Sequence, residues 1–152
     1  MKIRTVKANS RKRAFQLATS HRRYEIPYFK VDPAPSATDP VVSVSVDPEL
    51  GFEAFTYELA SGTEGTVHID QVLEHNQDPA YMRDLILYKL TLEARRRVEE
   101  YPMSKRQIIG RLGTSPTQFY RLLDTSNNRK SIDRMLELLH VLDCEVELVV
   151  KP

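Results

Sequence analysis

The sequence predicts an α+β fold, in which a small antiparallel β module precedes a helical domain. Short runs of β-branched and aromatic residues fill the first half of the chain, and Val41–Val46 alternates without a break. A long helical pattern begins after Asp78-Pro79, and two short helix-start signals flank Gly113 beyond it. These observations divide the chain into a β-rich module of residues 1–77 and a helical domain of residues 78–152.

Five strands are expected in the β-rich module, each bounded by residues that break regular structure. They are residues 3–8, 14–18, 41–46, 54–59 and 66–69. Proline, aspartate, serine and glycine gather between them, in residues 32–40, 47–51 and 61–65. The short turns predict one antiparallel meander with one face packed and the other in water.

The helical domain is expected to begin with one long helix. Asp78 is a favourable cap and Pro79 occupies the first helical position, so the helix runs over about residues 80–101 and ends before Pro102. Apolar side chains occur on nearly all sides of its middle: Tyr81, Leu85, Ile86, Leu87, Tyr88, Leu90 and Leu92. A helix of this kind is buried by more than one neighbour, so we expect it to pack in the helical domain and on the β module.

The chain is expected to end with a helix and a strand. Residues 131–142 place their apolar side chains on one face, and Cys144 follows as a small buried hydrophobe. Residues 145–150, Glu-Val-Glu-Leu-Val-Val, have the alternation of a strand. This short C-terminal strand would either join the N-terminal sheet or pair with a second copy of the chain.

Between these elements lie two short helices with similar start signals. Ser104 and Ser115 are each followed three residues later by glutamine, so each serine can accept from a free amide while the glutamine reaches back. The first helix runs to about Leu112 and ends at Gly113, which takes the left-handed conformation readily. In the second, Pro116 occupies the first helical position, where a missing N–H costs nothing.

This pair of helices with a glycine turn resembles the Xre-type or phage-repressor helix-turn-helix family, over roughly residues 78–144. The resemblance implies a lambda-repressor-like helical domain whose second helix, residues 115–124, enters the major groove of double-stranded DNA. Ile109 stands where the family usually has alanine, and its branched side chain implies a wider crossing of the two helices. The β module is faintly similar to the N-terminal module of gamma-butyrobetaine-hydroxylase-like proteins, without the zinc-binding cysteines of some of them.

The second helix is expected to read DNA bases. Thr117, Gln118 and Arg121 occupy its first turns, where glutamine can pair with adenine and arginine with guanine. Ser115 and the amides around it point toward a phosphate. Tyr120 either donates its hydroxyl to a phosphate or covers apolar surface. The resemblance implies further phosphate contacts from residues that flank the helix: Lys105, Arg106, Asn127, Asn128, Arg129 and Lys130.

Charge is strongly segregated along the chain, although the formal net charge is only +1. Residues 1–30 hold nine Lys/Arg against one Asp/Glu (+8), and residues 31–77 hold none against nine (−9). Residues 78–102 balance at five against five, residues 103–131 hold six against one (+5), and residues 132–152 hold two against five (−3). The expected helix-turn-helix is therefore the basic part of the C-terminal half, as phosphate contact requires.

Membrane and secretory classes are not favoured by the sequence. No apolar run approaches the ~20 residues that span a bilayer, and no apolar block follows the charged N-terminus, so we expect no membrane association and no secretory signal. One cysteine cannot form an internal disulfide, which favours a reducing cytoplasm.

Enzymatic and metal-binding classes are not favoured either. The chain has no glycine-rich phosphate loop and no serine elbow. Its histidines are spaced unlike metal ligands: His21, His68, His75 and His140. The acidic residues of the β module lie scattered along expected strands: Asp47, Glu49, Glu53, Glu58 and Glu64. We therefore expect no enzyme, no cofactor and no metal.

Three functions remain open at this point. The leading one is a bacterial or phage transcriptional regulator that binds a specific DNA sequence as a homodimer and uses residues 1–77 for dimerisation or sensing. The second is an antitoxin-like protein that binds DNA through residues 78–152 and a protein partner through residues 1–77. The third is a protein-interaction module that does not bind DNA.

Overall fold

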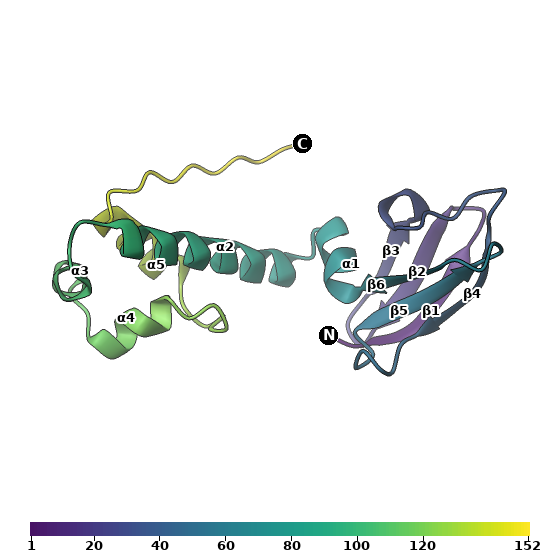
Figure 1. Ribbon diagram of the computed structural model, residues 1–152, viewed down its shortest axis with the longest axis horizontal. Coiled ribbons are helices and arrows are strands. Elements are labelled where there is room, and N and C mark those ends of the chain that lie inside the picture. Colours follow the sequence, from purple (N-terminus) through teal and green to yellow (C-terminus); the bar gives the residue numbers. More distant parts are fainter. The chain divides into compact units, whose positions relative to one another are not determined.

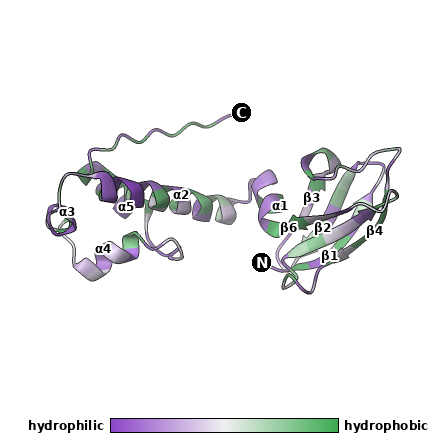
Figure 2. Ribbon diagram, in the orientation of Figure 1, coloured by the Kyte–Doolittle hydropathy of each residue, from purple (hydrophilic) through white to green (hydrophobic).

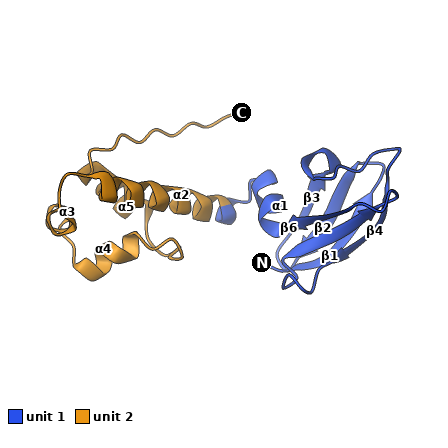
Figure 3. Cartoon of the chain, in the orientation of Figure 1, with its two compact units in different colours: residues 1–81 blue, residues 82–152 orange.

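The computed structural model describes residues 1–152, and its contacts divide the chain into two compact units (Figure 3). Unit 1 comprises Met1–Tyr81 and unit 2 comprises Met82–Pro152. The chain forms six β-strands, five α-helices and one short 3₁₀ helix. The expected α+β class is therefore confirmed.

Unit 1 contains two antiparallel sheets of three strands each (Figure 1). The first joins β1 (Ile3–Asn9), β2 (Ala14–Thr19) and β3 (Arg23–Pro27), and the second joins β4 (Val41–Val46), β5 (Ala54–Leu59) and β6 (Glu64–His68). The prediction of one five-stranded meander was wrong. The proline-rich segment between β3 and β4 separates the strands into two meanders, and β3 was missed because it is short, charged and ends in proline.

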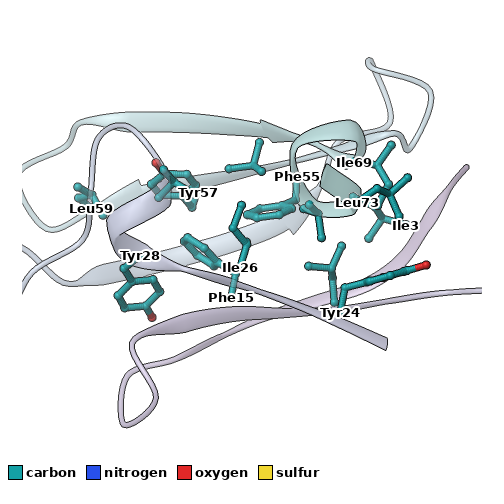
Figure 4. Packing of buried hydrophobic residues seen from close by; sticks show 14 residues of the cluster. Ile3, Phe15, Tyr24, Ile26, Tyr28, Phe55, Tyr57, Leu59, Ile69 and Leu73 are labelled. Carbon is teal, nitrogen blue, oxygen red and sulfur yellow. The ribbon is translucent and has the colours of Figure 1, made fainter. Parts of the chain in front are cut away.

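The two sheets share one core, which Figure 4 shows between them. Strand alternation turns Phe15 of β2, Ile26 of β3 and Tyr57 of β5 inward, and all three are almost fully buried. The ring of Phe15 lies 5.0 Å from that of Phe55 and 4.8 Å from that of Tyr57, measured between centroids. Aromatic packing at these distances stabilises the module beyond simple area burial.

Tyr57 fixes one close approach inside this core. Its ring lies over Gly65, the residue paired with it on β6, so tightly that an added Cβ at Gly65 would overlap the ring. Its hydroxyl donates to the carbonyl oxygen of Pro33 at 2.7 Å. Burial, with a smaller contribution from Asp32, raises the pKa of Tyr57 to about 12.

Two short helices complete unit 1. One is η1 (Tyr28–Lys30), and the other is α1 (Ile69–His75), which packs against β3 and β6. The strand expected over residues 66–69 ends at His68, whose Nδ1 accepts from the amide of Asp70 at 3.1 Å and caps α1. Histidine is an unusual cap, so the sequence did not predict this helix.

The long helix α2 (Pro79–Glu100) begins as expected, because the Asp78 carboxylate accepts from the amide of Tyr81 at 3.2 Å. Within unit 2 it buries a single stripe: Leu87, Thr91, Ala94 and Val98. The other apolar side chains of its middle, Ile86, Tyr88 and Leu92, are not covered by unit 2. No helix, α2 included, combines the length and apolar character needed to cross a membrane.

Unit 2 packs α2 with three shorter helices around a second core. They are α3 (Lys105–Leu112), α4 (Pro116–Leu122) and α5 (Ile132–Val141). The fully buried side chains at its centre are Ile108, Phe119, Met135 and Leu138. Ile109, which the resemblance marked as unusual, is half-buried against this core.

The C-terminal strand expected over residues 145–150 does not form. Residues 144–152 adopt neither helix nor strand, and all of residues 145–152 are exposed. A strand needs a neighbouring strand to hydrogen-bond its backbone, and neither sheet of unit 1 includes this segment.

Candidate nucleic-acid interface

The start and the end of α3 follow from its sequence. The Ser104 hydroxyl accepts from the Gln107 amide at 3.2 Å, and the Gln107 side chain accepts in return from the Ser104 amide at 3.0 Å. Gly113 ends the helix with a left-handed φ of 69°, and its amide donates to the carbonyl oxygen of Ile109 at 3.0 Å. Both features agree with the sequence prediction.

The start of α4 differs from that of α3 in one respect. The Ser115 hydroxyl accepts from the Gln118 amide at 3.2 Å, and Pro116 takes the first helical position as expected. The Gln118 side chain, however, does not reach back to Ser115, so the second capping box is incomplete. The Gln118 amide group is therefore exposed without an internal hydrogen-bond partner, which leaves its donors and acceptor available to a ligand.

α4 has two opposite faces. Phe119 and Leu122 are buried in the core of unit 2, as predicted. Thr117, Gln118 and Arg121 are exposed, and at about 100° per residue they share one sector of the helix, with Gln118 at its edge beside Leu122. The helix thus presents two hydrogen-bonding residues and one guanidinium to solvent while its apolar side fixes it to the unit.

The exposed face of α4 continues into a polar depression of unit 2. This depression brings two of the expected base-reading residues, Gln118 and Arg121, together with Arg129 from the following loop. Arg134 of α5 also lines it, although its guanidinium pairs with Glu137. Sequence reasoning missed Arg134, because only the return of the chain through the loop brings α5 to this place.

The loop after α4 is held by its own side chains. The Asn127 amide donates to the Arg121 carbonyl at 3.2 Å, and its oxygen accepts from the Arg129 amide at 3.0 Å. Bonds from the hydroxyl and amide of Ser126 lower the pKa of Asp124, so this carboxylate stays charged. Asn127 therefore shapes the loop and leaves Asn128 and Arg129 exposed.

Lys130 has a structural position that the sequence did not indicate. Its half-buried ammonium donates to the carbonyl oxygens of Leu122 at 2.9 Å and Asp124 at 2.8 Å, at the C-terminal end of α4. Burial lowers the pKa of Lys130, and Asp124 partly opposes this shift. A cation at these carbonyls stabilises the helix end.

The remaining expected contact residues lie at the helix starts or on the exposed side of α4. Lys105 pairs with Glu99 at 3.0 Å, which raises the pKa of Lys105, whereas Arg106 is exposed and forms no ion pair. Ser115 serves as the cap of α4. Tyr120 is 54% exposed, with its ring edge against Phe119 at 5.4 Å between centroids, so its hydroxyl is available to a ligand.

Charge in unit 1 divides along the sequence, with basic residues first and acidic residues after them. Residues 1–30, which form the first sheet, hold nine Lys/Arg against one Asp/Glu, and residues 31–77, which include the second sheet, hold nine Asp/Glu and no Lys/Arg. Glu25, the one acid of the first sheet, pairs with Lys12 at 3.2 Å. The acids of residues 31–77 lie mostly in turns and in α1, and only Glu58 and Glu64 stand on strands of the second sheet.

No three His, Cys, Asp or Glu residues lie together as a set of metal ligands. The chain matches no protein-family model, no curated protein and no solved structure.

Proposed function

We propose that this chain is a sequence-specific DNA-binding regulator with a helix-turn-helix of the Xre or lambda-repressor type. α3 and α4 are the two helices of the motif, and α4 is the recognition helix that enters the major groove. The regulator acts in the cytoplasm, without a cofactor and without catalysis.

The observation that carries this proposal is the exposed face of α4. Thr117, Gln118 and Arg121 point away from the core, and the Gln118 and Arg121 side chains have no partner within the chain. Glutamine and arginine are the residues that pair bidentately with adenine and guanine in the major groove. Their position on a helix anchored by Phe119 fits direct reading of base edges.

Phosphate contacts fall to the exposed cations and polar groups around α4. Arg106 and Arg129 form no ion pair, so they can meet phosphates without losing an internal partner. Asn128 and Tyr120 are exposed beside them, and Ser115 caps the helix end that faces a phosphate. Such contacts set the orientation on DNA but carry no sequence information.

The proposed regulator is a homodimer. A single recognition helix reads only a short half-site, and regulators of this type place two such helices about 34–36 Å apart on successive major grooves. A palindromic operator is the expected consequence.

The test compares one base-reading residue with one phosphate-binding residue on sequences selected from a random duplex pool. Arg121→Ala should cost about 1–3 kcal/mol in binding and relax the preference at one base position. Arg106→Ala is the matched control and should weaken all sequences alike, with a salt slope lower by about one. If both variants lose the same affinity for every sequence, Arg121 does not contact a base.

A second candidate function is that of an antitoxin-like protein, which binds DNA through unit 2 and a protein through unit 1. The acidic stretch of residues 31–77, with nine Asp/Glu and no Lys/Arg, favours it, because such a stretch is complementary to a basic partner. A small basic protein encoded beside this chain, and captured by it in low salt, would support this function. If the chain captures this protein but binds no DNA even in low salt, the interaction-module function without DNA is favoured.

A further inference from the structure

The segment after α5 leaves unit 2 from a fixed point. Asp143 has a left-handed φ of 57°. Its amide donates to the carbonyl oxygen of His140 at 3.0 Å, and the amide of Cys144 donates to the carbonyl oxygen of Leu139 at 2.9 Å. The Tyr101 hydroxyl donates to the Asp143 carboxylate, and this bond raises the pKa of Tyr101. The base of the segment is thus anchored both to α5 and to the chain just after α2.

Beyond this anchor, the C-terminal tail (residues 145–151) exposes four apolar side chains. Val146 is 48% exposed, Leu148 83%, Val149 74% and Val150 82%. Figure 2 shows green, hydrophobic stretches in the extended segment that leads to the C-terminus. No backbone hydrogen bond pairs this segment with the rest of the chain. Adjacent exposed apolar residues with free backbone groups mark a surface that pairs with another chain.

The tail is complementary to itself in an antiparallel arrangement. When two copies are aligned with Leu148 opposite Leu148, Val146 lies opposite Val150 and Glu145 lies opposite Lys151. Because side chains alternate between faces, Val146, Leu148 and Val150 of both copies fall on one face. The other face carries both Glu145–Lys151 ion pairs. In a parallel arrangement in register, Glu145 would instead meet Glu145.

We propose that two copies of this chain dimerise by pairing their C-terminal tails as antiparallel β-strands centred on Leu148. The pairing supplies the hydrogen-bond partners that the tail lacks in one chain. A two-stranded ribbon needs a cover for its apolar face, and unit 2 exposes further apolar side chains that can provide it: Tyr88, Leu92, Ile132 and Leu136. This inference gives the proposed regulator its dimer interface, but its test uses no DNA, so it can fail while DNA binding stands.

The first experiment reverses charges in the full chain and measures dissociation by sedimentation in low salt. In a homodimer of either single variant, Glu145→Lys or Lys151→Glu, like charges lie opposite one another at two places. The dissociation constant of each homodimer should therefore be about 5- to 30-fold higher than that of wild type. An equimolar mixture of the two variants restores both ion pairs and should return to the wild-type value. A wild type that stays monomeric at tens of micromolar, or a mixture no tighter than the single variants, would overturn the proposal.

The second experiment tests the register through disulfide formation in a Cys144→Ser background. Leu148→Cys places two thiols directly opposite each other, so air oxidation should yield a covalent dimer. Val149→Cys is the matched control, because the proposed register sets residue 149 opposite Glu147, and it should stay largely monomeric. Faster crosslinking at residue 149 than at residue 148 would contradict this register. Circular dichroism should show the same fold in every variant, because the tail contributes nothing to either core.

Discussion

Replacing Lys130 by methionine should destabilise unit 2 without removing a phosphate contact. Methionine keeps most of the aliphatic stem but loses the bonds to the Leu122 and Asp124 carbonyls at 2.9 and 2.8 Å. Hydrogen bonds to charged groups contribute about 1.5–3 kcal/mol each. The site is only half-buried, so water replaces part of what is lost, and we expect a total loss of about 2 kcal/mol. In a domain of this size, that lowers Tm by roughly 8–16 °C.

Arg129→Met is the matched control at the neighbouring position. Arg129 is exposed and forms no ion pair, so its loss should leave stability within about 0.5 kcal/mol of wild type. It should, however, lower the slope of log K against log salt by about 0.9, the value for one phosphate. Thermal unfolding followed by circular dichroism, and DNA titrations below the Tm of both variants, measure the two effects. A Lys130→Met protein as stable as wild type, with a slope lower by one, would refute the structural role of Lys130.

Three further predictions concern the two cores. Gly65→Ala should cost about 1–3 kcal/mol in stability, since the new methyl overlaps the Tyr57 ring; wild-type stability in urea would show that the ring moves freely. Phe119→Ala should lower the stability of unit 2 by about 3–5 kcal/mol and abolish DNA binding, while the NMR signals of unit 1 stay dispersed. If the signals of unit 1 also lose their dispersion, the two units unfold together. The buried Tyr57 phenol is neutral in the folded chain, and its raised pKa means that it stabilises the fold at pH values below its ordinary pKa of 10.0. This contribution should be lost as the pH rises toward about 12. Absorbance titration should show this late ionisation in wild type but not in Tyr57→Phe.

The elements that the sequence predicted well are those set by local chemistry. Strand alternation located β4 and β5, and the serine caps, Pro116 and Gly113 located both ends of α3 and the start of α4. Each of these signals acts over a few residues, so it can be recognised without knowing the fold. The exposed face of α4 followed in the same way from helical periodicity.

The parts that were missed depend on contacts distant in sequence. One sheet was expected where the proline-rich segment separates two. Of the two pairings expected for residues 145–150, the one with the N-terminal sheet does not form, because neither sheet includes this segment. Lys130 was expected at a phosphate, whereas the turn after α4 brings its ammonium back to the helix end. α2 carries apolar residues on several sides, and only packing decides which of them are buried.

The most direct test of the proposed function is a titration of the full chain with two duplexes, one enriched by selection and one of scrambled sequence, from low to physiological salt. We expect the enriched duplex to bind about 10³-fold or more tightly than the scrambled one, and the affinity for both to fall as salt rises. Equal affinity for the two duplexes, or no binding even in low salt, would contradict the assignment of α4 as a recognition helix.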